Sequence, residues 1–191
     1  VISSNQVAKQ TAAKLPVKKL ILSNHQQKLV ATAPTLHVAN ETNWAPIDFT
    51  VSGQPQGYSI DILNLISSMT GLKFEYINGF TWLELIDKFK RGEIDLLHSL
   101  FKNGNNESLG LMSSSFLQLP FSVITQPNKS QIKSIADLNG KTLAIPAGWS
   151  IIPEIKQYFP KVIIIELAST KAVLNAVEEG AAYAGLDSDI I

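Results

Sequence analysis

The stretch from Leu36 to Met69 constrains the fold more than any other part of this 191-residue sequence. Leu36 to Ala39 is a short apolar run ended by Asn40, which is the length of a buried strand. After a loop with a small hairpin, apolar residues recur at helical spacing from Ile62 to Met69, and Gly71 supplies a typical helix end. This strand, loop and helix predict an α/β sheet, in which small ligands lie beyond the carboxyl ends of the strands.

Strand and helix patterns alternate along the rest of the chain. We expect strands at residues 73–77, 94–97, 142–145, 162–166 and 182–186, and helices capped by Ser23, Thr81, Ser150 and Ser169. Leu29 is the clearest candidate for burial on the helix at residues 24–32, and a weaker helix is expected at residues 5–14. This alternation indicates parallel sheets joined by right-handed crossovers.

The best candidate for a domain boundary follows an extended apolar segment at residues 116–125. Residues 127–130 have the composition of a linker. We therefore expect a lead-in with a helical linker at residues 1–34, a first α/β lobe at residues 35–126, and a second, incomplete α/β lobe at residues 127–191.

Composition and motifs exclude several classes of function. The 16 basic and 16 acidic side chains balance, so the chain lacks the positive charge that nucleic-acid binding requires. With no cysteine and three scattered histidines there is no metal-ligand spacing, and no phosphate loop or nucleophile elbow is present. No apolar run is long enough to span a bilayer. We expect a binding domain without metal, cofactor or enzymatic activity.

The order of the short motifs resembles that of the bacterial extracellular solute-binding proteins of family 3. The motifs are Leu36-His37-Val38-Ala39, Trp44-Ala45-Pro46, Gly57-Tyr58-Ser59-Ile60-Asp61, Thr81-Trp82, Gly92-Glu93-Ile94-Asp95-Leu96-Leu97 and Ile135-Ala136-Asp137-Leu138-Asn139-Gly140-Lys141. The helical lead-in from Leu22 to Leu29, followed by Pro34, is similar to that of the sensor domains that precede membrane histidine kinases or diguanylate cyclases. The resemblance covers the chain from about Leu22 to its end.

The resemblance implies an α/β, two-lobed type II periplasmic-binding fold, the Venus flytrap, with a ligand held between the lobes. In such a fold the chain returns to the first lobe after the second, so we expect a domain that is C-terminally truncated here. The implied role is a periplasmic sensor domain that closes on a small molecule and signals to a membrane-linked output module, with a possible homodimer in the parent receptor. The alternatives are a free solute-binding component of an ABC transporter and a small dehydratase or lyase.

Relatives that bind amino acids carry Thr-x-x-Arg after the third strand, and the arginine clamps the ligand carboxylate. The matching positions here are Asn103 and Asn106, which bring no positive charge. Both asparagines could equally serve only as turn formers in a loop rich in Asn and Gly. Either interpretation argues against binding of a standard α-amino acid.

Two tryptophans are candidates for closing over the ligand from opposite lobes. Trp44 lies in the loop after the first strand, and Trp149 lies in the Gly148-Trp149-Ser150 loop of the second lobe. A role in packing is the alternative for both. Ser150 is expected either to cap a helix or to contact a ligand, because amides at a helix N-terminus attract polar groups.

Four further side chains complete the predicted ligand site. Asp187 follows the last strand, where the family often keeps an acid for a ligand ammonium, although a solvated carboxylate is the alternative. Asp48 and Phe49 lie in the hairpin after the first strand, and Ser99 lies just past the expected third strand. Trp44, Trp149 and the missing arginine favour a small ligand that is weakly charged or aromatic.

Overall fold

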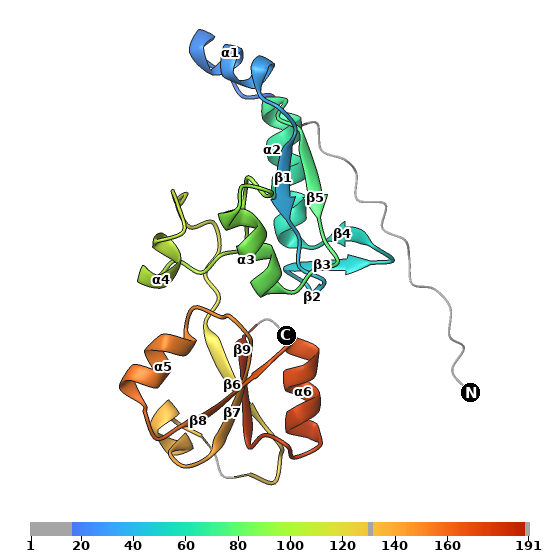
Figure 1. Cartoon of the computed structure of the whole chain (residues 1–191). Helices are drawn as coiled ribbons and strands as arrows, with labels where there is room; N and C mark the ends of the chain where they lie inside the picture. The colour runs from blue at the N-terminus through green and yellow to red at the C-terminus, as the bar shows by residue number, and fades with distance from the viewer. Residues whose placement is uncertain (1–16, 130–131, 190–191) are drawn as a thin grey trace, which may run out of the picture.

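The computed structural model describes residues 17–129 and 132–189 as two lobes, one above the other in Figure 1. The helix expected at residues 5–14 lies outside the described residues. The first lobe holds α1 (Asn24–Thr32), β1 (Leu36–Ala39), β2 (Asn43–Trp44), β3 (Asp48–Val51), β4 (Gln54–Gln56), α2 (Tyr58–Thr70), β5 (Phe74–Ile77), α3 (Trp82–Lys90) and α4 (Gly104–Glu107). The second holds β6 (Phe121–Thr125), η1 (Ile135–Leu138), β7 (Thr142–Pro146), α5 (Ile152–Tyr158), β8 (Ile163–Leu167), α6 (Thr170–Glu178) and β9 (Ala184–Ser188).

The parallel sheet of the first lobe consists of β1 and β5. The third strand expected at residues 94–97 is wrong as a strand, because only Val38 and Leu96 form a bridge there. The amides of Asp95 and Leu96 both donate to the carbonyl oxygen of His37, at 2.9 and 3.1 Å. Two successive amides that share one acceptor cannot continue a ladder, so the segment touches β1 and leaves it.

A three-stranded antiparallel sheet, β2-β3-β4, leads into α2. Gly57 at the helix start has φ +121°, and the Ser59 hydroxyl donates to the Ile47 carbonyl oxygen at 2.7 Å. This anchors the first turn of α2, whose buried residues are Ser59, Ile60 and Leu63. The apolar stripe expected on α2 is only partly buried, since Leu65 and Ile66 remain 42% and 37% exposed beyond the small sheet.

Ser23 and Thr81 cap α1 and α3, as the sequence predicts, and at both helices the residue at N3 completes a capping box. α3 buries Leu85 against Ala39 of β1 and Ile94. The expected burial of Leu29 on α1 is wrong, because its side chain is 55% exposed. α1 stands at the far end of the first lobe in Figure 1, where its faces meet few partners. Because α1 has no buried residue, the capping box at Ser23 contributes more to the stability of this helix than packing does.

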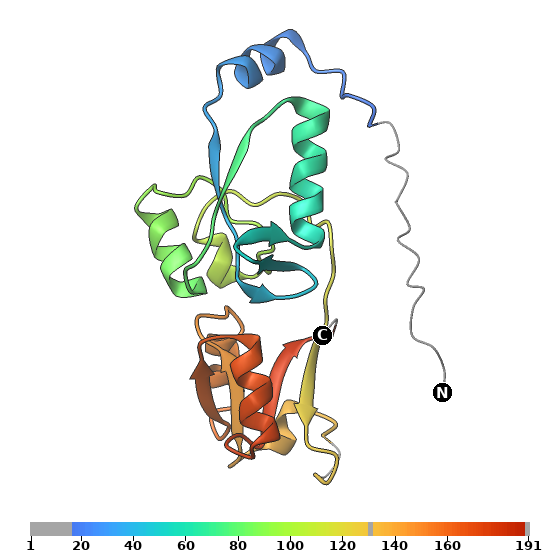
Figure 2. The ribbon, with the colours of Figure 1, turned by 90° about the vertical axis from the view of Figure 1, so that its right-hand side faces the viewer.

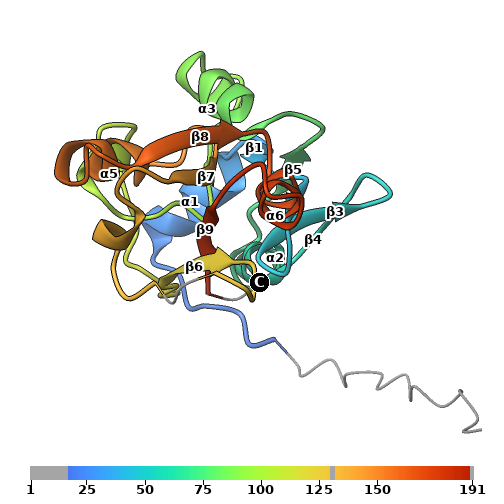
Figure 3. The same cartoon turned by 90° about the horizontal axis from the view of Figure 1, so that it is seen from below.

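The second lobe is a four-stranded sheet in the order β6-β9-β7-β8, with β6 antiparallel to β9 and the other neighbours parallel. Side chains alternate along β7: Leu143 and Ile145 pack in the same core cluster as α5, whereas Ala144 packs with Val173 of α6. The two helices therefore cover opposite faces of the sheet, as Figure 3 shows.

The strand β6 was expected in the first lobe, which was predicted to end at residue 126, but it belongs to the sheet of the second lobe. All five residues of β6 pair with β9, from Phe121 opposite Ser188 to Thr125 opposite Ala184. Figure 2 shows the chain descending from the first lobe directly into this strand. We therefore propose that the chain crosses between the lobes before Phe121, and that the linker composition at residues 127–130 marks a turn within the second lobe.

Candidate functional site

A cavity of about 330 Å³ lies between the two lobes. Its first-lobe wall is formed by residues 41–43, after β1, and by residues 79–82 and 84, which belong to the loop after β5 and the first turn of α3. Its second-lobe wall is formed by residues 146–149, after β7, and 168–170, after β8. Each of these loops follows the carboxyl end of a parallel strand, the place where open α/β sheets hold ligands.

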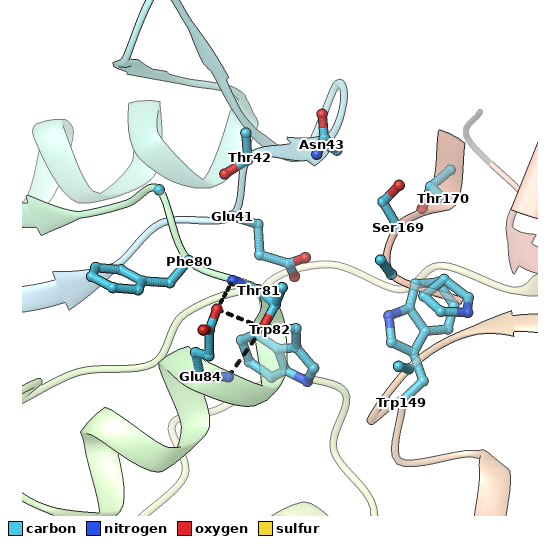
Figure 4. A pocket seen from close by; sticks show the side chains of 14 residues that line it. Glu41, Thr42, Asn43, Phe80, Thr81, Trp82, Glu84, Trp149, Ser169 and Thr170 are labelled. Atoms are coloured by element: carbon cyan, nitrogen blue, oxygen red, sulfur yellow. Dashed lines mark hydrogen bonds between the residues drawn. The ribbon is translucent and has the colours of Figure 1, made fainter. Parts of the chain in front are cut away.

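Glu41 projects its carboxyl group into this cavity from the first lobe, towards Ser169 and Thr170 of the second (Figure 4). The pKa of Glu41 is raised from its ordinary 4.5 to about 8. Burial is the largest cause, and the negative charges of Asp48 and Asp187 add to it. Because this pKa is close to neutral pH, the Glu41 carboxyl group can take up or release a proton when its surroundings change.

Asp48 lies behind Glu41 in a buried polar cluster. Its Oδ1 accepts from Asn40 Nδ2 at 2.5 Å, and its Oδ2 accepts from the Glu41 amide at 3.0 Å. Burial raises the pKa of Asp48 to about 7 and lowers that of His98 to about 4, while Nε2 of His98 lies 3.5 Å from Asp48 Oδ2. The cluster holds the loop after β1 against β3, and so positions Glu41.

Asp187 is the buried carboxyl group of the second lobe, as Asp48 is of the first, and it lies fully buried near the end of β9. Its Oδ1 accepts from the Ser188 amide at 2.7 Å, whereas its Oδ2 has no hydrogen-bond partner among the described residues. Burial raises the pKa of Asp187. Trp44 reaches across from the first lobe, and its Nε1 donates to Ser188 Oγ at 3.2 Å.

An aromatic cluster joins the lobes beside the cavity. The rings of Trp44 and Trp149 meet edge to face, with centroids 6.1 Å apart and planes at 63°. Phe101 contacts both tryptophans, and Phe121 contacts Phe101 and Trp149. The gap left between the lobes at this cluster is only about 20 Å³, so here the side chains pack on one another.

Direct hydrogen bonds also cross from the first lobe to the second. Asn103 Nδ2 donates to Ser150 Oγ at 2.8 Å, and Asn105 Nδ2 donates to the Ser150 carbonyl oxygen at 2.9 Å. Asn103 Oδ1 also accepts from the Asn106 amide at 3.0 Å and caps α4. The expected helix cap at Ser150 is wrong, because α5 begins after Ile151 with no side-chain cap and the Ser150 hydroxyl serves the lobe contact.

The structure brings together most of the side chains predicted from the sequence, but not all in one place. Trp149 lines the 330 Å³ cavity, and the residues around the small gap include Trp44, Ser99, Asn106, Trp149 and Ser150. Asp48 and Asp187 are buried behind the walls, and Phe49 lines neither space. Asn103 acts through its bond to Ser150.

Sequence reasoning missed several residues that line the cavity. These are Glu41, Thr42, Asn43, Phe80, Trp82, Ser169 and Thr170. In the sequence, Trp82 was noted as part of the Thr81-Trp82 motif and Ser169 only as a helix cap; Trp82 also packs against the Leu85 cluster, and Ser169 does cap α6. Their position in the sequence could have identified them, since each residue lies just beyond an expected strand or begins the helix that follows it, where α/β sheets bind ligands.

The raised carboxyl pKa values predict that stability falls as the pH rises from 6.5 to 8. Glu41 and Asp48 remain protonated in the folded state where the unfolded chain has ionised them, so the folded state binds more protons and loses stability with rising pH. His98 has the opposite effect, but only between its folded pKa of about 4 and its unfolded value of 6.5. Thermal unfolding at both pH values should show a lower midpoint at pH 8, with a smaller difference in Glu41→Gln. An equal difference in that variant would contradict the assignment.

Two α/β lobes with a cavity between their strand ends define the Venus-flytrap class of binding domains. The sequence profile of the bacterial extracellular solute-binding proteins, family 3, matches residues 36–189, and the chain belongs to that family. The structure thus confirms the predicted fold class. Within the described residues, no helix has both the length and the apolar character needed to cross a membrane.

Similar proteins include bacterial sensors. The virulence sensor protein BvgS of Bordetella bronchiseptica is 28% identical over 169 residues, which is 88% of this chain and 14% of that protein. The sensor protein EvgS of Escherichia coli K12 is 24% identical over 164 residues, which is 85% of this chain and 14% of that protein. The crystal structure of the periplasmic VFT2 domain of Bordetella pertussis BvgS aligns with a TM-score of 0.76 at 27% identity, covering 88% of this chain and 72% of that one. The chain thus spans about a seventh of the length of these curated relatives.

Proposed function

We propose that this chain is the periplasmic ligand-binding part of a sensor, in which a small molecule in the cavity holds the two lobes together. The observation that carries the proposal is the cavity itself, because its walls come from both lobes in similar measure. A ligand that contacts both walls binds the closed arrangement better than an open one, and this difference in affinity is what a receptor transmits. The sensor relatives BvgS and EvgS support the same role.

The proposed output lies in a parent protein that is attached to the membrane. The relatives are much longer sensor proteins, and the solved domain that this chain resembles is periplasmic. We propose a parent sensor kinase, within which two copies of the domain are able to pair. A binding role is favoured over catalysis because the matched relatives are sensors.

A thermal-shift screen of small metabolites, followed by small-angle scattering, tests the proposal. A true ligand should raise the unfolding midpoint, with a stabilisation that grows with the logarithm of its concentration above Kd, and should reduce or hold the radius of gyration. Glu41→Gln and Trp82→Ala should weaken the effect, since both residues line the cavity. A ligand whose effect survives both changes would place binding elsewhere and contradict the proposal.

Removal of the Ser150 hydroxyl should weaken ligand binding by roughly two- to tenfold. The closed form then loses the acceptor of the 2.8 Å bond from Asn103, which is worth about 0.5–1.5 kcal/mol. Ser150→Ala leaves the cap that Asn103 provides to α4 intact. Ser68→Ala is the control, because the Ser68 hydroxyl bonds only within α2. Calorimetry on both variants measures the change, and equal affinities would show that this bond does not contribute to closure.

A further inference from the structure

We propose that the cavity between the lobes takes a small organic cation, an ammonium compound with an apolar or aromatic body, held by the Glu41 carboxylate between Trp82 and Trp149. The inference rests on the proposed function and names the class of ligand for the same cavity. It changes the expectation of a weakly charged ligand, because Glu41 was not among the residues predicted from the sequence.

The charges that line the cavity are of one sign. The lining includes Glu41 and Glu84 and no lysine, arginine or histidine. Glu84 is occupied, since its Oε2 accepts from the Thr81 amide at 2.7 Å and from the Thr81 hydroxyl at 2.8 Å. Among the described residues, no donor is recorded within hydrogen-bond distance of the Glu41 carboxyl group. Glu41 therefore offers a carboxyl group in the cavity that has no recorded side-chain partner among the described residues.

Lys88, a basic side chain that contacts Phe80 of this wall, has other partners. Lys88 Nζ lies 4.4 Å from the centre of the Phe80 ring and bonds to Glu93 Oε2 at 2.8 Å. It does not line the cavity. An anionic ligand would thus enter a space lined by two carboxyl groups and by no cationic side chain, so no opposite charge in the lining would compensate for the loss of its hydration.

Aromatic rings supply the rest of the recognition. Phe80, Trp82 and Trp149 line the cavity, and Figure 4 shows the Glu41 carboxyl group above Trp82, with Trp149 on the opposite wall. The face of a tryptophan ring attracts an ammonium group, by about 0.5–2 kcal/mol according to how far water is excluded. A carboxylate together with aromatic faces is a combination that suits an organic cation better than a neutral or anionic compound of the same size.

Binding of a cation is also coupled to a proton. The groups that act on Glu41 are Asp48 and Asp187, with Glu84 on the same cavity wall, and the buried His98 behind Asp48 is neutral at pH 7 because its pKa is lowered to about 4. Since the pKa of Glu41 is raised to about 8, the empty cavity holds a proton there at pH 7. An ammonium group stabilises the ionised carboxylate and should displace that proton.

Three probes of matched shape separate the possibilities: benzylamine, which is a cation at pH 7, benzyl alcohol and benzoate. Calorimetry on the whole chain should show benzylamine binding at least tenfold more tightly than either control, a difference of about 1.4 kcal/mol. Titrations in two buffers of different ionisation enthalpy should show release of up to one proton per benzylamine. Glu41→Gln should abolish both the preference and the proton release, whereas Glu179→Gln, which removes an exposed carboxylate at the other end of α6, should change neither.

Other outcomes separate this inference from the proposed function. If benzoate or benzyl alcohol binds as tightly as benzylamine and Glu41→Gln has no effect, the cation assignment is wrong while a ligand cavity remains. If none of the three binds, the inference also fails, and the metabolite screen then decides the proposed function alone. Preserved proton release in Glu41→Gln would move the titrating group elsewhere and overturn the assignment.

Discussion

Gly57→Ala is expected to lower the free energy of unfolding by about 3 kcal/mol or more, from backbone strain and overpacking together. A Cβ atom at this position would lie 2.4 Å from the carbonyl oxygen and 2.7 Å from the carbonyl carbon of Ile47. Backbone atoms cannot rotate away as a side chain does. The glycine also has φ +121°, which alanine rarely adopts. The substitution should therefore separate the start of α2 from the loop that carries Trp44.

Gly53→Ala is the matched control for this prediction. Gly53 lies in the turn between β3 and β4 with φ +75°, and a Cβ atom there would meet nothing within 4 Å. Backbone strain alone should then cost about 1–2 kcal/mol. Urea unfolding of both variants, followed by circular dichroism, measures the difference. Equal losses would mean that the close approach to Ile47 does not matter, and the packing described for this corner would be incorrect.

Gly148→Val is expected to keep the lobes apart and to weaken ligand binding by tenfold or more, about 1.4 kcal/mol. A Cβ atom at Gly148 would lie 2.3 Å from Leu83 Cδ2 and 3.4 Å from Trp82 Cδ1. Gly148 belongs to the second lobe and α3 to the first, so the added side chain would occupy the space in which the lobes meet. Leu83 is flexible and half exposed, which is why valine is a sharper test than alanine.

Gly140→Val separates lobe contact from backbone strain. Gly140 has φ +74°, close to the +78° of Gly148, and lies in a turn where a Cβ atom would have no neighbour within 4 Å. Both variants should lose similar stability in the second lobe, but only Gly148→Val should increase the radius of gyration in small-angle scattering. If the two variants scatter and bind alike, Gly148 has no part in closure.

Local signals in the sequence were sufficient for most helices and strands. Ser23, Thr81 and Ser169 each cap the helix predicted after them, because capping depends on residues only three positions apart. The strand expected at residues 94–97 failed for the opposite reason. Its apolar residues are those of a strand, but ladder formation depends on amides and carbonyls of β1 far away in the chain.

The site was harder to predict than the fold because it depends on contacts across the cavity. Trp44 and Trp149 were predicted to close over a ligand from opposite lobes, with packing as the alternative, and the structure packs their rings on each other with centroids 6.1 Å apart. Glu41 was missed because a lone glutamate after a strand looks like any solvated residue. Its significance comes from Asp48 and Asp187, which lie near it only in the folded chain.

The amino-acid sequence by itself determined most of the strands and helices, the caps at Ser23, Thr81 and Ser169, and the two-lobed class, because these depend on periodicity and on neighbours within a few residues. Tertiary structure alone decided which carboxyl groups lie at the cavity, which asparagines reach Ser150 and which strand pairs with β6. Those features depend on distances between segments remote in the chain, and burial at their meeting point turns ordinary side chains into groups with shifted proton affinity.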